Sequence, residues 1–338
     1  MSAALIVEEA GPAMTLQDLG RPGHLAEGLS PGGAMDVAAL HEGAALLGVP
    51  PGGAAIEMGG MGGRFRLTTP ARIALTGAPM RARAGGATLR WNAVHAMETG
   101  TVLEIGGCLA GQYGYLSLGG GIATPEVMGS RSVHTRAGIG APLRAGDRLP
   151  LGPDPAPGRA GLCLPDEDRF TGGLLRVLPS AQTARFPADM RARFEATEFK
   201  RAPRGSRLGV ALAAEGAGFA LPEALTLLSE VTLAGDVQIT GDGTPFLLLA
   251  DCQTTGGYPR IACILPMDLP RAAQAAPGAA LRFRFVEAEA AQTLHRRWRR
   301  ELALLPARCA PVIRDPGDMA DLLTAQLISG VTDGGELS

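Results

Sequence analysis

Glycine and proline interrupt this chain at short intervals along its whole length. The sequence holds 48 glycines and 26 prolines in 338 residues, and they follow no fixed period. The missing period excludes a collagen-like triple helix. Because these residues separate short apolar runs, and 46% of all residues are hydrophobic, the pattern predicts a mainly β fold with tight turns and a few helices.

The apolar runs place the expected elements. Helical spacing of apolar residues, with Asp36 near the start and Gly48 after the end, predicts a helix over 35–48. Further helices are expected over 183–199, 287–305 and 319–328. Strand-length runs predict strands at 72–77, 101–105, 113–118, 174–178, 225–228, 237–240, 246–250, 261–265 and 281–286.

A change in composition divides the chain. Residues 152–169 are rich in proline, glycine and charge and show no periodicity, which indicates a linker. We therefore predict an N-terminal domain over 1–151, a linker over 152–172, a C-terminal domain over 173–307 and a tail over 308–338. A repeated spacing indicates two similar halves: Glu57, Gly62 and Pro70 in the first, and Glu230, Gly235 and Pro245 in the second.

Charge and composition exclude several classes of protein. The formal net charge is -2, no basic stripe is present, and only 4% of residues are aromatic, which argues against a nucleic-acid binder. No apolar run approaches the length of a membrane span, and the first residues lack the basic and apolar regions of a signal peptide. Five scattered cysteines without a C-x-x-C pair indicate reduced thiols, so we expect a cytoplasmic protein.

Lys200 is the only lysine among 31 basic residues. A Walker-type phosphate loop requires Gly-Lys-Ser/Thr, and none is present. Lys200 lies in a polar stretch, which does not favour Schiff-base chemistry, and it lacks the flanking methionines typical of a biotin-carrying lysine. We therefore expect any nucleotide or carrier group to be supplied by another chain.

The densest group of polar residues lies in residues 237–260, VQITGDGTPFLLLADCQTTGGYPR. An apolar strand delivers a carboxylate, an amide, two hydroxyls, a phenol and a guanidinium beside a Gly-Gly turn. Such a cluster can bind a small carboxylate or a urea-like amide through side chains and exposed N–H groups. The alternative is a hairpin whose polar groups satisfy only their own turn.

Two further segments could bind an anion. Near the N-terminus, Arg21 can pair with a carboxylate or phosphate, and Gly32-Gly33 precede a predicted helix and present free N–H groups. The alternative there is that Asp36 caps the helix and Asp18 pairs with Arg21. The second segment is a Gly/Ser-rich loop with Arg131 and Arg136, which suits an anionic ligand, an acidic partner or simply solvent.

Other kinds of chemistry are not indicated. The five histidines lie far apart without H-x-x-x-H spacing, so we expect no metal site in this chain, and no G-x-S-x-G elbow is present. Cys252 lies inside the richest segment. A nucleophilic role would require a depressed pKa and a neighbouring base. No histidine is close in sequence, so we interpret Cys252 as incidental.

The motifs together resemble one family. TLQDLGR, PGGAMD, LTGA, GSRS, RAGIG, RAGD and above all GDGTP followed by LLADCQTTGGYPRIA occur in the order found in the family of the 5-oxoprolinase C subunit, also labelled allophanate hydrolase subunit 2, kinase-inhibitor antagonist or biotin-dependent carboxyltransferase-like. The resemblance covers about residues 5 to 286. It implies two cyclophilin-like β-barrel domains and a partner, the B subunit of the same enzyme, with a separate A subunit.

The resemblance also implies an activity: ATP-dependent cleavage of 5-oxo-L-proline to L-glutamate, with ATP bound at the level of the complex and a site shared with the B subunit. Two alternatives stay open. One is a urea- or allophanate-type carboxyltransferase subunit that receives carboxybiotin from a separate carrier. The other is a non-catalytic regulator that binds a kinase-inhibitor-like B subunit. A hetero-oligomer is expected in each case, with no nucleic acid and no membrane.

Two positions depart from the family pattern. Relatives usually carry arginine where this chain has Cys252, and a Ser-Asp/Asn-Arg-Met-Gly-x-Arg-Leu run where this chain reads GSRLGVAL over 205–212. Two guanidinium groups are therefore missing, which would weaken binding of a doubly charged anion. We assign catalysis to Asp251 and Arg260, Asp251 being the best candidate for a general base. Substrate binding is assigned to Gln17, Asp18, Arg21, Gly32, Gly33, Asp36, Arg131, Gln238, Asp242, Gln253, Thr254, Thr255, Gly256, Gly257 and Tyr258.

Overall fold

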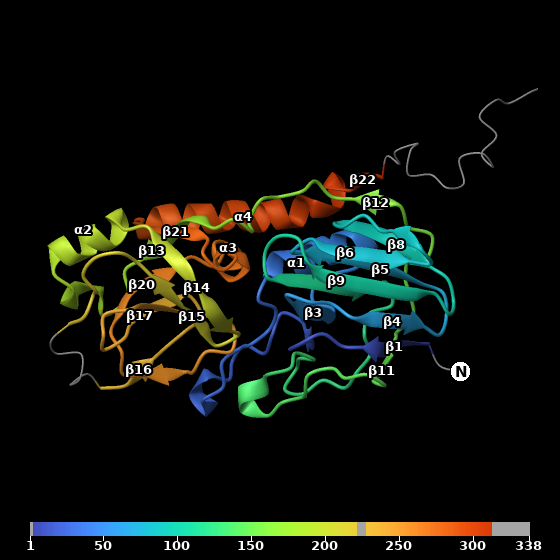
Figure 1. Ribbon diagram of the computed structural model, residues 1–338, viewed down its shortest axis with the longest axis horizontal. Helices are drawn as coiled ribbons and strands as arrows, with labels where there is room; N and C mark the ends of the chain where they lie inside the picture. Colours follow the sequence, from blue (N-terminus) through green and yellow to red (C-terminus); the bar gives the residue numbers. More distant parts are fainter. Residues whose placement is uncertain (1–2, 222–227, 313–338) are drawn as a thin grey trace, which may run out of the picture.

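The computed structural model describes residues 3–221 and 228–312. The predicted helix over 319–328 and all but the last residue of the predicted strand over 225–228 lie outside the described residues. Two β bodies lie side by side along the long axis of the molecule (Figure 1).

Two sheets packed face to face form the first body. The core between them is apolar: Leu5, Phe65 and Leu103 from one sheet meet Ile56 and Leu116 from the other. The six-stranded sheet has the order β11 (Arg148–Pro150), β1 (Ala4–Glu9), β4 (Arg64–Leu67), β9 (Val102–Cys108), β6 (Met80–Ala84), β7 (Ala87–Thr88). The seven-stranded sheet has the order β2 (Thr15–Gln17), β3 (Ala55–Gly59), β10 (Tyr113–Leu118), β5 (Ala71–Gly77), β8 (Ala93–Met97), β12 (Leu162–Cys163), β22 (Ala310–Pro311).

The second body is a closed barrel with an aromatic interior. Phe194 and Phe283 stack with their ring centroids 4.7 Å apart. The strand order is β13 (Gly173–Leu178), β20 (Arg260–Ile264), β17 (Asp236–Ile239), β18 (Pro245–Leu248), β15 (Gly209–Ala213), β14 (Phe199–Ser206), β21 (Ala280–Phe285). A separate pair, β16 (Glu230–Val231) and β19 (Thr255–Gly256), lies below it (Figure 1).

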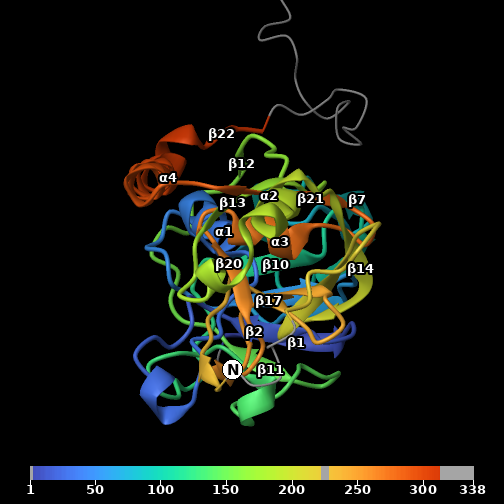
Figure 2. The same cartoon turned by 90° about the vertical axis from the view of Figure 1, so that its left-hand side faces the viewer.

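Helices cover and connect the two bodies. α1 (Val37–Leu47) packs on the seven-stranded sheet, and α2 (Ala188–Ala196) and α3 (Leu269–Gln274) belong to the barrel. α4 (Ala288–Arg308) runs along both bodies and lies above α1 in both views (Figures 1 and 2). Single 3-10 turns form η1 (Leu25–Glu27), η2 (Thr135–Ala137) and η3 (Thr183–Arg185).

The predicted mainly β fold with a few helices is confirmed, and the helix at 35–48 forms with Asp36 as its N-cap and Gly48 as its left-handed C-cap. The expected helix over 183–199 is wrong in its length. η3 ends before Pro187, which is the N-cap of α2, and strand β14 already begins at Phe199. Proline cannot donate the hydrogen bond that a continuous helix would require.

The predicted linker is more ordered than its composition indicates. It contains β12, which pairs with β8 and with β22, so a strand at the start of the predicted tail returns to the first body. The division into domains at the predicted boundaries stays a prediction. Within residues 3–221 and 228–312, no helix is long and apolar enough to cross a membrane.

Candidate functional site

A cleft of about 520 Å³ lies where the two bodies meet. Its volume falls in the range of about 300–1,000 Å³ that small-molecule sites occupy. The first body contributes the end of β3, the start of β10 and the loop at η2, and the barrel contributes β14 and the turn that follows it. The lining side chains that can bind or react are Glu57, Tyr113, Arg136, Arg201, Arg207 and Asp251.

Arg207 joins the two bodies at the floor of this cleft. Its Nε and Nη2 donate to the two oxygens of Asp251 at 2.8 and 2.9 Å, while Nη1 donates to Glu57 and Nη2 also donates to the carbonyl of Gly33. Burial opposes the charge of Arg207, but Glu57 and Asp251 outweigh it and raise the pKa of the guanidinium. Four of its five N–H donors are therefore engaged, and the group is held in one orientation.

Glu57 is fixed from behind by the first body. Its Oε2 accepts hydrogen bonds from the Met35 N–H at 2.8 Å and from the Tyr115 hydroxyl at 2.7 Å. Burial, and then the charge of Glu57, raises the pKa of Tyr115 well above its ordinary value, so the hydroxyl stays a donor. Both oxygens of the Glu57 carboxylate therefore accept hydrogen bonds. Glu57 positions Arg207 and is not available as a general base.

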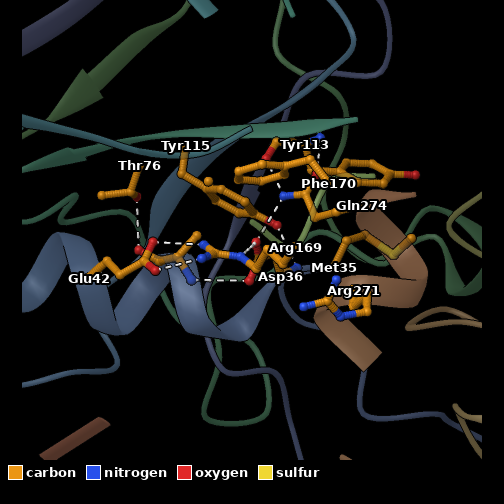
Figure 3. Close-up of polar contacts among 12 residues, drawn as sticks. Met35, Asp36, Glu42, Thr76, Tyr113, Tyr115, Arg169, Phe170, Arg271 and Gln274 are labelled. Carbon is orange, nitrogen blue, oxygen red and sulfur yellow. Dashed lines mark hydrogen bonds and ion pairs between the residues drawn. The ribbon is translucent and has the colours of Figure 1, made fainter. Parts of the chain in front are cut away.

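A second buried network lies behind this floor (Figure 3). Arg169 lies between Asp36 at the start of α1 and Glu42 further along that helix, with hydrogen bonds of 2.7 Å to each. Gln274 of α3 donates to Asp36 and to the carbonyl of Tyr113, both at 2.8 Å. The barrel and the first body are therefore joined by buried polar bonds directly beside the cleft.

Asp36 caps helix α1, as the alternative interpretation of the N-terminal segment predicted. Its Oδ1 accepts the Ala39 N–H at 3.2 Å and its Oδ2 accepts from Arg169 and Gln274. Asp36 is completely buried and is not among the residues that line the cleft. Its predicted contact with substrate stays a prediction.

The other predicted residues of the N-terminal motif form two groups. Gly33 and Gly32 lie next to residues of the cleft floor and are not among the lining residues. The Gly33 carbonyl accepts from Arg207, and a Cβ on Gly32 would lie 3.4 Å from Asp251 and 3.8 Å from Arg21. Burial lowers the pKa of Arg21, which donates to the carbonyls of Val127 and Ser132. Its Nη1 has no hydrogen-bond partner in the part of the chain that the structure describes.

Asp18 organises a loop instead of facing the cleft. It accepts hydrogen bonds from Gly20, Ser130, Ser132 and the Arg131 N–H, and it makes no ion pair with Arg21 among the described contacts. Gln17 donates to the carbonyl of Val133, and the Arg131 side chain pairs with Glu126 at the surface. These residues support the loop that carries η2 to the cleft mouth.

The two predicted catalytic residues of the segment after β18, Asp251 and Arg260, lie in different surroundings. Asp251 faces the cleft, whereas Arg260 pairs with Glu230, donates to the carbonyl of Val231 and contacts Gln182. The structure therefore does not bring the two predicted catalytic residues to one place, and the catalytic role of Arg260 stays a prediction.

The remaining predicted residues of this segment lie at two places, Asp242 in the turn between β17 and β18 and the others near the small sheet β16–β19. Gln253 donates to Gln238 at 3.3 Å, while the buried Nε2 of Gln238 has no partner within residues 3–221 and 228–312. Asp242 closes an exposed turn with Thr240 and Thr244, and these hydrogen bonds lower the pKa of Asp242. The stretch Thr254, Thr255, Gly256, Gly257 and Tyr258 lies outside the cleft lining.

Cys252 is buried next to Asp251. Burial, with the charges of Asp236 and Asp251, raises the pKa of its thiol to about 12. A thiol of this kind is a poor nucleophile at neutral pH. Within the described part of the chain, no group of three His, Cys, Asp or Glu side chains could hold a metal ion.

Several residues that line the cleft are not predicted as site residues by the sequence. Arg207 was noted only within a run that departs from the family pattern, Glu57 only within the repeated spacing, and Tyr113 only as the start of a strand. Arg201 lies in a polar stretch next to Lys200 and gave no signal. Their partners are about 20 to 170 positions away, so local spacing could not group them.

The match of a family model to most of this two-body β fold places it in the carboxyltransferase-type class. The family described as "Carboxyltransferase domain, subdomain A and B" matches residues 27–285. The chain belongs to this family, which fits the resemblance to the 5-oxoprolinase C subunit seen in the motifs. It is 32% identical over 293 residues to the C subunit of 5-oxoprolinase from Haemophilus influenzae, covering 84% of this chain and 91% of that one. To the same subunit from Escherichia coli it is 33% identical, covering 82% and 90%.

Solved structures share the fold. The crystal structure of TTHA0988 matches with a TM-score of 0.76 and 31% identity over 84% of this chain. This chain spans only 56% of that longer one. The Kluyveromyces lactis urea carboxylase matches with a TM-score of 0.79 over 93% of this chain and 31% of its own, and at 22% identity it shows the fold alone.

Proposed function

We propose that this chain is the C subunit of an ATP-dependent 5-oxoprolinase, which opens 5-oxo-L-proline to L-glutamate at a site shared with the B subunit. The names and coverage of the two bacterial relatives support the assignment. The observation that carries it is the Arg207 clamp, in which one guanidinium holds Glu57 and Asp251 from the two bodies at the floor of a cleft sized for a small ligand.

In this proposal, the Arg207 guanidinium donates a hydrogen bond to the amide oxygen of 5-oxoproline, on which negative charge develops during the reaction. Arg207 retains one N–H that no hydrogen bond within residues 3–221 and 228–312 uses, and its orientation is fixed by Asp251, Glu57 and Gly33. A donor fixed before the reaction stabilises developing charge without reorganising. We assign Asp251 the role of orienting this donor. Arg260 is proposed to hold β16 against the barrel, and through it the surface for the B subunit.

ATP is proposed to bind on another polypeptide of the complex, and the A subunit is the candidate. This chain has no Gly-Lys-Ser/Thr loop, and Lys200 is exposed on β14 outside the cleft lining. The same lysine is unsuited to carry biotin. Under the carboxyltransferase alternative, biotin would therefore arrive on a separate carrier. The cytoplasm is the proposed location, and the five free cysteines support it.

The B subunit is proposed to dock on the face formed by β16 and β19. Large apolar side chains are exposed there: Leu228 by 86%, Val231 by 56% and Tyr258 by 47%. We take these exposed apolar side chains, which all lie on or near β16 and β19, as support for an interface at this face. The relatives are named as one lettered subunit of 5-oxoprolinase, which requires companion subunits in those proteins. The predicted residues Thr255, Gly256 and Gly257 lie in or next to β19 and would contact the docked partner, whereas Thr254 is buried beneath that face.

Reconstitution with the A and B subunits tests the proposal. We expect ATP hydrolysis that depends on 5-oxoproline and yields glutamate, and no ATPase from this chain alone. Asp251→Asn should reduce kcat/KM by about 10- to 1,000-fold, as loss of a fixed electrostatic group does. Asp189→Asn, at the exposed start of α2, is the matched control. Turnover of urea with a biotin carrier would favour the carboxyltransferase alternative, and binding of the B subunit without any turnover would favour the regulator.

A further inference from the structure

Arg201 is a buried guanidinium to which the described residues give no acidic partner. Only 4% of the residue is exposed, yet no carboxylate pairs with it in the described part of the chain. Its Nη1 makes one long bond of 3.4 Å to the carbonyl of Ala202, and its buried Nε finds no partner among the described residues. Burial lowers the pKa of the group. A buried cation is normally paired, so this arrangement is unfavourable unless something else supplies the negative charge.

The backbone around Arg201 is built to present it to the cleft. Its N–H donates to Ala279 at 3.1 Å, and its carbonyl accepts from Gly278 at 2.8 Å, so its position on β14 is fixed. The pairing of β14 with β15 shifts register between Arg201 and Gly205. A Cβ on Gly205 would lie 3.0 Å from Nη2 of Arg201, so glycine leaves room for the guanidinium there.

Tyr113 offers a second donor in the same cleft. Burial, followed by the charge of Glu57, raises the pKa of Tyr113 to about 12, and the charges of Arg207 and Arg201 act on the same hydroxyl. The hydroxyl is therefore protonated at neutral pH, and the described residues give it no hydrogen-bond partner. The charge of Arg207 is already balanced by Glu57 and Asp251, whereas the charge of Arg201 is not balanced by any described carboxylate. Of these two arginines, Arg201 is therefore the one that can pair with a bound anion.

We propose that Arg201 and the Tyr113 hydroxyl form a subsite for the carboxylate of the substrate, so that the cleft selects cyclic amides that carry a carboxylate. This inference rests on the proposed function. A single guanidinium with one hydroxyl matches a planar, singly charged carboxylate, which accepts two parallel N–H bonds. A carboxylate bound there would place the rest of a small ring toward the Arg207 clamp, since both arginines line one cleft.

The test uses the reconstituted complex and two ligands that differ only in the carboxylate. 5-Oxoproline is the substrate, and 2-pyrrolidone, the same ring without the carboxylate, is a competitor. Arg201→Gln should raise the KM for 5-oxoproline by about 10- to 100-fold, as loss of a charge-assisted hydrogen-bond pair does, while kcat changes by less than about threefold. The inhibition constant of 2-pyrrolidone should stay within about threefold.

Three further variants make the result decisive. Arg204→Gln removes the same charge from an exposed position in the same bulge and should leave the KM unchanged. Arg201→Lys should recover part of the lost affinity, and Tyr113→Phe should raise the KM by about three- to tenfold through loss of one hydrogen bond. The last two variants keep most of the side-chain volume, so they test the subsite even if Arg201→Gln fails to fold.

The outcomes separate this inference from the proposed function. If the wild-type complex does not turn over 5-oxoproline, the proposed function is wrong. If it does, but Arg201→Gln and Tyr113→Phe keep the wild-type KM, the subsite is refuted while the function stands. An equal loss of affinity for 5-oxoproline and for 2-pyrrolidone would also refute it, because the effect would then not depend on the carboxylate.

Discussion

Arg169 and Glu42 are joined by two parallel hydrogen bonds of 2.7 Å each, one from each terminal nitrogen of the guanidinium to one oxygen of the carboxylate. Arg169 comes from the segment that composition predicts to be a linker, and Glu42 lies in the middle of α1. Both side chains are almost completely buried. The connection between the two bodies is thus anchored in the first body by one of its most buried ion pairs.

Arg169→Gln should lower the free energy of unfolding by about 3–5 kcal/mol. Removal of one partner from a buried pair leaves the other charge uncompensated, and here both Asp36 and Glu42 lose their cation. The charges of Asp36 and Glu42 raise the pKa of Arg169 well above its ordinary value against the effect of burial. Denaturant unfolding of the purified chain measures the loss.

An exposed pair on the same molecule is the control for Arg169. Arg297 pairs with Glu301 one turn later on α4, and the Arg297 side chain is 77% exposed. Arg297→Gln should change the free energy of unfolding by less than about 0.5 kcal/mol, since pairs of this kind in water contribute little. Equal losses in the two variants would show that Arg169 does not have the structural role described.

Secondary structure was largely predictable because its signals are local. The apolar spacing, Asp36 and Gly48 define α1 within a single short stretch of the chain, and glycine or proline bounds most of the strands. Residues 183–199 were predicted wrongly because Pro187 and the barrel pairing of β14 decide the structure there. The strand β12 was missed because it is only two residues long and forms by pairing with distant strands.

The site was only partly predictable, because most of its contacts join residues that are far apart in the sequence. Asp251 was found because polar residues crowd around it in sequence. Arg207 and Glu57 lie 150 positions apart, and neither has a local pattern that indicates the other. The proposed role of Arg201 depends on the lack of an acidic partner among the described residues, which a sequence cannot show. Arg260 has the right neighbours in sequence, but the hairpin turns it toward Glu230 and away from the cleft.

Gly33→Ala should lower both stability and activity. Gly33 has a φ of 85°, a conformation unfavourable for alanine, and its Cβ would lie 2.8 Å from the Gly20 nitrogen. The expected loss of stability is about 2–5 kcal/mol, the sum of conformational strain and overpacking. Activity should fall too, because the Gly33 carbonyl accepts from Arg207. Thermal unfolding and the reconstituted assay measure the two effects.

Gly121→Ala separates the conformational cost from the steric one. Gly121 has a φ of 66°, but no atom lies within 4 Å of its added Cβ. This variant should lose only about 1–2 kcal/mol, the cost of the left-handed conformation itself, and should keep its activity. If both variants behave alike, close packing at Gly33 does not position Arg207.

His134 should make the protein less stable as the pH falls below about 6.5. Burial lowers the pKa of this histidine, whose Nε2 lies 2.9 Å from the Ser30 hydroxyl. Between the lowered pKa and 6.5, the unfolded chain binds a proton that the folded chain does not, so stability rises with pH in this window and is level above it. Each such group contributes at most about 1.4 kcal/mol per pH unit.

The pH dependence of unfolding in His134→Gln isolates this effect. His41 and His95, whose pKa values burial also lowers, act in the same direction, and Glu42, whose pKa burial raises, acts in the opposite one. All three remain in the variant, so the difference between the two slopes belongs to His134. Parallel slopes for the two proteins between about pH 5 and 6.5 would show that His134 titrates alike in the folded and unfolded chains.

Cys252 should be chemically inert in the folded protein. With the pKa of its thiol raised to about 12, only about one thiol in ten thousand is ionised at pH 8, and the thiolate is the reactive form. Iodoacetamide should therefore leave Cys252 unmodified in the native chain and modify it after unfolding, as peptide mass spectrometry can show. Cys252→Ala should retain activity within about twofold, since the thiol is buried and is not among the residues that line the cleft. Rapid native labelling that abolishes activity, together with an inactive Cys252→Ala, would instead make this thiol part of the reaction, because only a thiolate stabilised by its surroundings reacts so readily.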